Sequence, residues 1–161
     1  MKKTILWLSL VALILSSCSE PKYDNSKVAY ILFKTPTFKF ADMGFIYQSK
    51  DESKLQIYSN GKAIMSLRVK RDSVCMSSFK CMSKEMFNKM ILSSSYPKDL
   101  LSHILKAQPI FDKIGIRYNT DGFTQTIKRD GKYDIEYSVD KEKIEFIDTL
   151  NRVKIKIDKD I

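Results

Sequence analysis

Two parts of the chain alternate between apolar and polar residues with the period of two that is typical of β-strands. In the first part, Phe38 and Phe40 share one face, and the odd-numbered residues 63–69 (Ala, Met, Leu and Val) share the apolar face of a later strand. In the second part, "KYDIEYSV" and "RVKIKID" each place all their apolar residues on one face. Such alternation predicts antiparallel strands with one buried and one solvated face.

Short polar loops separate the strands of the first part. The expected turns are Ser49–Ser53 and the pair Asn60-Gly61. Asn-Gly is a strong signal for a two-residue hairpin, because both residues tolerate positive φ. The strands therefore follow one another in hairpin order.

The middle of the chain changes to the helical period of 3.6. Residues 83–94 and 97–107 each predict a short helix, with Ser83 as the N-cap of the first. Pro97 suits the first turn of the second helix, and Pro109 lies just beyond its end. The apolar stripes are Met86, Phe87, Met90 and Ile91 in the first helix, and Leu100, Leu101, Ile104 and Leu105 in the second. The expected fold class is α+β, an antiparallel sheet covered by two short helices.

The N-terminal segment has the composition of an export signal. Lys2 and Lys3 precede an apolar run, Ile5–Leu15, of 11 residues. A transmembrane helix needs about 20 apolar residues, so this run suits the h-region of a secretory signal peptide instead. The sequence Leu15-Ser16-Ser17-Cys18 that ends it resembles the bacterial lipobox, in which the cysteine receives diacylglycerol.

This resemblance implies a domain plan and a location. Residues 1–17 are the expected signal peptide, 18–27 the lipidated N-terminus and flexible tether, and 28–161 a single domain. The alternatives are an uncleaved anchor, or an ordinary signal peptide with an incidental cysteine. Ser19 stands where an aspartate would favour retention in the inner membrane, so the implied location is the outer membrane, on its periplasmic face.

The charge of the chain is positive but dispersed. Removal of residues 1–17 leaves 144 of 161 residues, and loss of Lys2 and Lys3 lowers the formal charge from +9 to +7. Basic surfaces attract anionic lipids and nucleic acids. The lysines here alternate with apolar residues along strands, and no nucleic-acid-binding signature is present. We therefore expect a solvated face and no nucleic-acid partner.

Two cysteines remain once Cys18 is acylated. Cys75 and Cys81 are six residues apart, and an oxidising periplasm favours their pairing across a tight turn. The alternatives are a disulfide and two buried free thiols. The spacing is not that of a C-x-x-C redox motif.

The chain offers little catalytic chemistry. His103 is the only histidine, and it lies beside the apolar stripe of the second predicted helix. Five late carboxylates alternate with lysines and apolar residues, which predicts an outward polar face rather than an acid/base pair. They are Asp134, Glu136, Glu142, Glu145 and Asp148. The sequence predicts no enzyme, no metal site and no cofactor.

The order of elements resembles the LolA/LolB family of lipoprotein carriers and receptors, and LolB-type proteins in particular. The resemblance covers the hairpins of 40–69, the two-helix insert of 83–109, and the closing strands of 126–139 and 143–158. It implies a curved half-barrel sheet, helices that cover it as a lid, and an apolar space for the acyl chains of lipoproteins. The loop Ser59–Lys62 lacks the exposed leucine that LolB-type loops carry.

The resemblance also implies partners and a site. The partners are the membrane, through the N-terminal lipid, a periplasmic lipoprotein carrier and client lipoproteins. The alternative is a structural or surface-exposed lipoprotein with a filled core and no carrier role. The expected acyl-chain cavity is lined by Phe38, Phe40, Phe45, Tyr47, Met65, Leu67, Phe87, Met90, Leu101, Ile104, Tyr133, Ile135, Tyr137 and Ile155.

Overall fold

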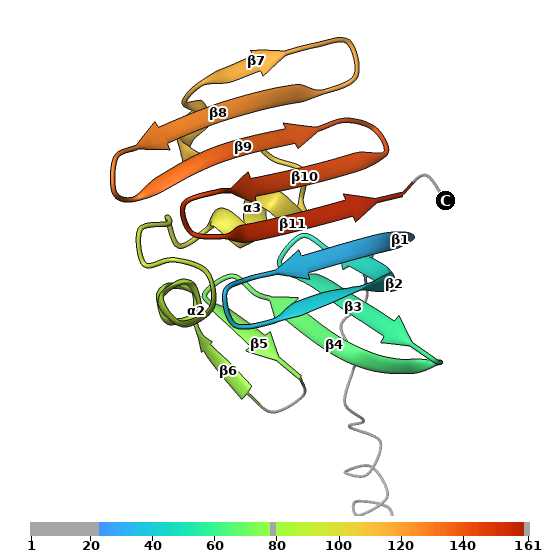
Figure 1. The fold of residues 1–161 in the computed structure, drawn as a ribbon. Helices are drawn as coiled ribbons and strands as arrows, with labels where there is room; N and C mark the ends of the chain where they lie inside the picture. Colours follow the sequence, from blue (N-terminus) through green and yellow to red (C-terminus); the bar gives the residue numbers. More distant parts are fainter. Residues whose placement is uncertain (1–22, 78–79, 160–161) are drawn as a thin grey trace, which may run out of the picture.

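One open antiparallel sheet of 11 strands dominates the computed structural model, which describes residues 23–77 and 80–159 (Figure 1). Its strands are β1 (Asn25–Lys34), β2 (Lys39–Gln48), β3 (Ser53–Ser59), β4 (Lys62–Val69), β5 (Ser73–Met76), β6 (Lys80–Ser83), β7 (Ile116–Tyr118), β8 (Phe123–Arg129), β9 (Tyr133–Val139), β10 (Lys143–Asp148) and β11 (Val153–Asp158). Their order is β6-β5-β4-β3-β2-β1-β11-β10-β9-β8-β7. Two meanders thus meet where β1 pairs with β11.

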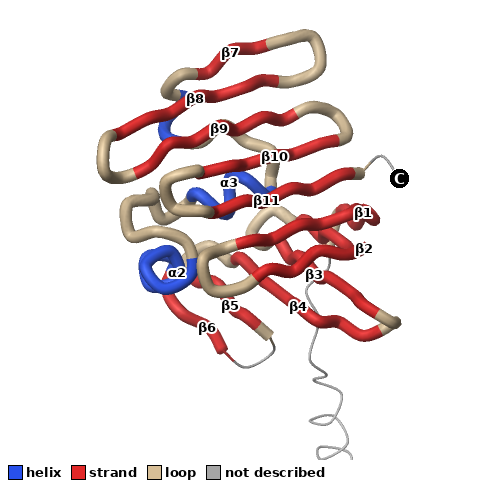
Figure 2. Tube along the Cα trace, in the orientation of Figure 1, coloured by secondary structure: helices blue, strands red, loops and turns tan. Residues whose placement is uncertain are grey.

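The helices lie in the connection between the two edges of the sheet. After β6 at one edge come α2 (Lys84–Ile91), α3 (Leu100–Leu105) and the short η1 (Phe111–Lys113), and β7 then forms the other edge. The chain between these edges crosses one face of the curved sheet, which we call the inner face (Figures 1 and 2). The predicted antiparallel sheet with two short helices is confirmed.

The second helix has the predicted buried stripe and the first does not. All four apolar residues of the α3 stripe are buried. In α2, Ser83 caps the helix as predicted, because its side chain accepts a hydrogen bond from the Met86 backbone N–H. Phe87 is buried, but the side chains of Met86 and Met90 are exposed, which contradicts the predicted stripe.

Polar residues occupy the buried face of α2 instead. Lys84 is buried, and its Nζ lies 2.7 Å from Oδ1 of Asp99. Asn88 is buried too, and its Nδ2 donates a hydrogen bond of 2.9 Å to the Pro97 carbonyl. These partners lie on the segment before α3. Because they satisfy the two polar side chains, α2 packs on that segment and leaves its methionines in solvent.

The predicted hairpin turns are present. Asn60 and Gly61 have φ values of 50° and 75°, as a tight two-residue hairpin requires. A register shift next to Tyr58 places Ala63 opposite Tyr58, whereas Met65 lies opposite Ile57. The extra residue breaks the alternation, so Ala63 does not share the inner face with Met65, contrary to the sequence prediction.

The first strand begins earlier than predicted. β1 starts at Asn25, within the segment 18–27 that the sequence predicts as tether. The predicted signal peptide and the lipidation of Cys18 lie outside the described residues. Among the described residues, no helix has the length and apolar character needed to cross a membrane.

A disulfide joins the two strands at one edge of the sheet. Cys75 of β5 and Cys81 of β6 are directly opposite in the antiparallel register, and their sulfurs are bonded. Of the two alternatives for these cysteines, the structure has the disulfide.

Candidate functional site

A pocket of about 250 Å³ opens at the end of the sheet where β1 begins and β11 ends. We call it the mouth pocket. It lies between the inner face of the sheet and the end of α3. Its lining residues are Asn25, Lys27, Ile46, Gln48, Leu105, Lys106, Ala107, Ile144 and Lys159.

The floor of the mouth pocket is apolar and fixed in place. Ile46, Leu105 and Ile144 are buried members of the hydrophobic core. The side-chain amide of Gln48 donates a hydrogen bond of 2.6 Å to the Leu105 carbonyl, which ties the end of α3 to β2. Such a floor suits an apolar part of a ligand.

Three lysines, Lys27, Lys106 and Lys159, surround this floor. Lys106 donates a hydrogen bond of 3.0 Å to the Lys50 carbonyl, and Lys159 one of 2.7 Å to the Lys141 carbonyl. None of the residues that line the pocket is acidic. Burial and the nearby charge of Lys27 lower the pKa of Lys159 below its ordinary value. The carboxylates of Glu142 and Asp140 act on the pKa of Lys159 in the opposite direction. The lining itself has three lysines and no carboxylate, so an anion in the pocket would relieve the repulsion between Lys27 and Lys159.

The predicted acyl-chain lining residues mostly lie in a packed interior. Phe87, Ile104, Ile135 and Ile155 have no accessible surface, so no water-sized space adjoins them. The other buried members of the predicted set are Met65, Leu67, Leu101, Tyr133 and Tyr137. Phe38 and Phe40 are partly buried and pack against this core near the turn between β1 and β2. The side chains that the sequence assigns to a cavity fill the space between the sheet and the helices.

Three members of the predicted set lie elsewhere. Met90 is exposed on α2. Phe45 and Tyr47 alternate with the buried Gly44 and Ile46 along β2, so they are on the outer face of the sheet. β2 carries apolar residues on both faces, and alternation alone does not tell which face is buried.

Hydrogen bonds attach the segment after α3 to the inner face. The Tyr137 hydroxyl donates to the Gln108 carbonyl at 3.1 Å. Gln125 is buried on β8; its oxygen accepts from the Ile110 N–H, and its nitrogen donates to the carbonyls of Ile110 and Ile114. The hydrophobic pattern of the sequence does not predict this clamp. Its signal is a polar residue at an apolar position of the alternating segment "FTQTI".

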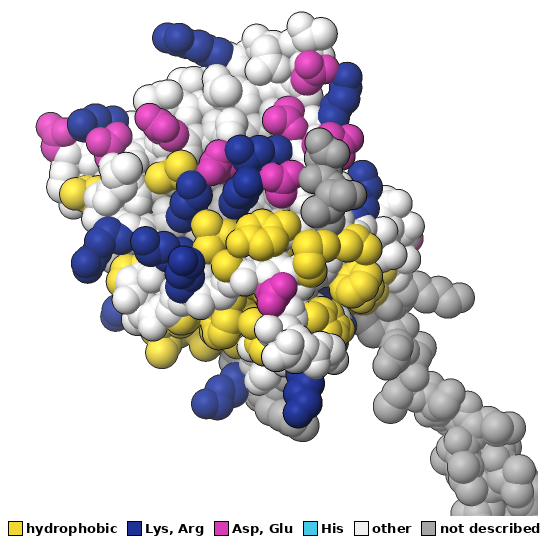
Figure 3. Space-filling model, turned by 45° about the vertical axis from the view of Figure 1, so that its right-hand side comes forward, with side chains coloured by type: hydrophobic (Ala, Val, Ile, Leu, Met, Phe, Trp, Pro, Cys, Tyr) yellow, Lys and Arg dark blue, Asp and Glu magenta, His cyan; other side chains and the backbone are white. Residues whose placement is uncertain are grey.

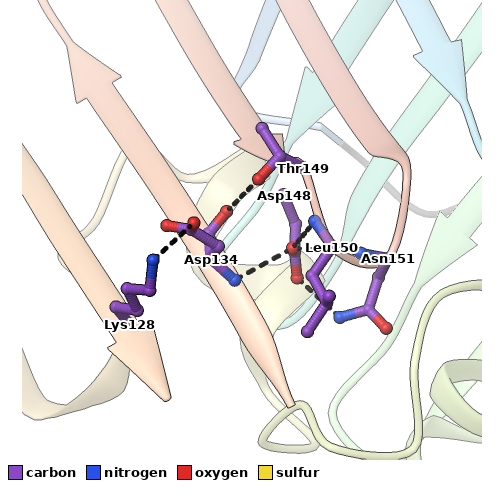
Figure 4. Close-up of polar contacts among 6 residues, drawn as sticks. All are labelled: Lys128, Asp134, Asp148, Thr149, Leu150 and Asn151. Atoms are coloured by element: carbon purple, nitrogen blue, oxygen red, sulfur yellow. Dashed lines mark hydrogen bonds and ion pairs between the residues drawn. The ribbon is translucent and has the colours of Figure 1, made fainter. Parts of the chain in front are cut away.

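A buried carboxylate lies on the inner face, at the end of the sheet opposite the mouth pocket. Asp148 was expected on the outward polar face, but it is almost fully buried. It accepts hydrogen bonds from the backbone N–H groups of Asp134, Leu150 and Asn151 and from the Asn151 side chain (Figure 4). The Tyr96 hydroxyl donates a further hydrogen bond to it. This complete set of donors compensates for burial and indicates a structural role. Across residues 23–77 and 80–159, no three His, Cys, Asp or Glu side chains are grouped to hold a metal ion.

Comparison of the sequence with models of protein families finds no matching family, and comparison with curated proteins finds no match either. The chemistry of the mouth pocket gives the clearest indication of a ligand. Its apolar floor and its lysines suit a molecule that combines an anionic group with an apolar part.

Proposed function

We propose that this protein is a lipid-anchored lipoprotein of the cell envelope, LolB-like in organisation, that binds acyl chains. In this proposal Cys18 carries the lipid, and the mouth pocket receives the anionic end of a single-chain lipid. The leader sequence supports the anchor. A sheet with two helices inserted between its edge strands supports the LolB-like organisation.

The observation that carries the proposal is the pairing of a lysine rim with an apolar floor. Each methylene that leaves water for such a floor contributes about 0.8 kcal/mol, and hydrogen bonds from ammonium groups to an anion are stronger than neutral ones. Small-molecule sites usually measure about 300–1,000 Å³. The mouth pocket, at about 250 Å³, therefore suits an anionic group and the first methylenes of a chain.

The proposed location is the periplasmic face of the outer membrane, and the proposed role is binding rather than catalysis. The acyl chains that the lysine rim suits would belong to envelope lipids with an anionic end. Those of lipoproteins in transit, delivered by a periplasmic carrier, have no such group and would contact the apolar floor alone. The lysines of the pocket can bind and orient an anion, but no carboxylate or imidazole lines the pocket to exchange protons with them.

A second candidate is a structural lipoprotein without a carrier role. The observation that favours it is the filled interior, where the largest buried side chains have almost no accessible surface. The clamp formed by Gln125 also holds the segment after α3 against the sheet. The two candidates differ in whether the mouth pocket binds a lipid.

Native mass spectrometry of the full chain, purified from its membrane in mild detergent, separates them. Dodecanoate is the probe, and the variant K27Q/K159Q is compared with K89Q, which changes an exposed lysine of α2. We expect dodecanoate to bind the wild type and K89Q, and to bind K27Q/K159Q about tenfold more weakly, which corresponds to about 1.4 kcal/mol.

The same spectra report the anchor through the intact mass of the chain, which a lipid on Cys18 raises. A chain that carries lipid on Cys18 but binds no dodecanoate would support the structural lipoprotein. A chain without lipid on Cys18 would overturn the anchor, whatever the pocket binds.

A further inference from the structure

The outer face of the sheet carries a group of exposed apolar side chains. Val28 and Tyr30 of β1 lie opposite Phe45 and Met43 of β2, and Tyr47 follows on β2. We call these five residues the aromatic patch. The first four are 49%, 38%, 37% and 38% exposed, respectively. Hydrophobic side chains gather on this side of the molecule in Figure 3. Contiguous apolar surface of this kind marks an interaction site.

The neighbouring part of the outer face, on β10 and β11, carries charged side chains. On β10 and β11, Glu145 lies 3.1 Å from Lys143 and 2.9 Å from Lys154, and Lys156 pairs with Asp158 at 2.9 Å. Acidic and basic side chains border the hydrophobic area in Figure 3. The two halves belong to one continuous sheet, so the apolar half is a local feature of β1 and β2.

The chain reaches the sheet at this patch. The ring of Tyr23 lies 5.3 Å from that of Tyr47, and its hydroxyl donates a hydrogen bond to Glu52. Only four residues separate Tyr23 from Cys18, so the two are at most about 18 Å apart in extended chain. A lipid on Cys18 would therefore keep the aromatic patch close to the bilayer surface.

The chemistry of the patch suits that surface. Tyrosine is enriched where a membrane meets water, because its ring is apolar and its hydroxyl is polar. Lys54 lies 5.2 Å from the centre of the Tyr47 ring and can face anionic headgroups. We propose that the aromatic patch lies on the membrane surface and orients the anchored domain; this inference rests on the proposed lipid anchor.

The orientation has a consequence for the mouth pocket. The patch occupies the outer face of β1 and β2, whereas Asn25, Lys27 and Ile46 of the same strands line the pocket on the inner face. Contact between the patch and the bilayer therefore leaves the pocket on the face of the sheet that is turned away from the membrane.

Quenching of a fluorophore by spin-labelled lipids tests this orientation. The full chain is reconstituted in vesicles of phosphatidylethanolamine and phosphatidylglycerol, with the dye NBD on S26C or on E136C. Ser26 lies opposite Tyr47 at the patch, and Glu136 is exposed on the charged half of the outer face. We expect headgroup spin labels to quench the dye at S26C at least about twofold more than at E136C.

Two further variants link the quenching to the patch. M43S/F45S should lower the quenching at S26C to the level of E136C, whereas Y118S/L150S, which changes exposed apolar residues elsewhere, should not. Equal quenching at S26C and E136C in a chain whose Cys18 carries lipid would overturn the inference alone. Dimers in these vesicles without that quenching would assign the patch to a second copy. A chain that lacks the lipid would overturn the anchor and the inference together.

Discussion

The hydroxyl of Tyr96 donates a hydrogen bond of 2.5 Å to Oδ2 of Asp148, and both side chains are buried. Tyr96 lies between α2 and α3, and Asp148 ends β10, so the bond joins the helical layer to the sheet. Burial and the adjacent carboxylate raise the pKa of Tyr96 above its ordinary value. Polar contacts of this kind fix the position of the helices more specifically than apolar packing does.

The variant Y96F should lower the free energy of unfolding by about 1.5–3 kcal/mol, the range for a hydrogen bond to a charged group. Urea unfolding at neutral pH measures it, with Y118F at an exposed tyrosine as the control. The raised pKa gives a second signature. Wild-type stability should fall above about pH 10, where the unfolded tyrosine ionises and the folded one does not. Y96F should lose less stability there; equal losses would contradict this assignment.

The ion pair between Lys84 and Asp99 should stabilise the protein at neutral pH and lose this effect in acid. The hydrogen bond from Lys84 lowers the pKa of Asp99 in the folded protein. The contribution of the ion pair to stability is therefore complete above the pKa of Asp99 in the unfolded chain, about 3.9, and is lost as the pH falls through its lower pKa in the folded protein. D99N should destabilise the protein by about 1–2 kcal/mol, because it leaves a buried ammonium unpaired while the carboxylate was partly exposed.

Urea unfolding between neutral pH and pH 2 checks this effect. The D99N and wild-type curves should converge in acid. D51N is the control, because it breaks an ion pair with Arg71 in which both side chains are exposed. A constant difference between D99N and the wild type at every pH would show that the loss has another cause.

The disulfide should stabilise the folded chain and hold together the two strands at the edge of the sheet. Cys75 and Cys81 close a loop with a sequence separation of six, for which the chain-entropy relation gives about 2 kcal/mol. We expect C75S/C81S to lose that amount in urea unfolding and to exchange amide hydrogens faster in β6 and at the start of α2. Unchanged exchange in β6, with the same loss of stability, would place the effect in the unfolded chain alone.

Sequence patterns predicted burial well where only one face of an element is apolar. Tyr133, Ile135 and Tyr137 of β9 alternate with polar residues, and all three are buried as predicted. β2 has apolar residues on both faces, so alternation did not reveal that Phe45 and Tyr47 point outward. Propensity also identified the Asn60-Gly61 turn, because its φ values depend on those two residues alone.

The hydrogen bonds of the buried polar side chains could not be predicted from the sequence, because their partners lie far along the chain. Gln125 binds a segment 11 to 15 residues earlier, and Asp148 binds Tyr96, 52 residues away. The mouth pocket likewise combines Lys27 and Lys159 from opposite ends of the domain. A pattern of hydrophobicity records which residues prefer burial, but it does not record which polar groups meet there.

The Gln125 clamp offers a test of whether the helical layer opens. It holds Ile110 and Ile114 on either side of three successive residues with positive φ, whose values are 45°, 52° and 67°. Such conformations are strained for residues other than glycine. Q125L removes the clamp and leaves buried backbone groups unpaired, at a cost of about 1–3 kcal/mol. Amide exchange should therefore rise in residues 110–116.

We expect dodecanoate to bind Q125L as tightly as the wild type, because the floor of the mouth pocket is held by Gln48 and not by this clamp. Tighter binding to Q125L would instead mean that chains enter the interior when the helical layer loosens.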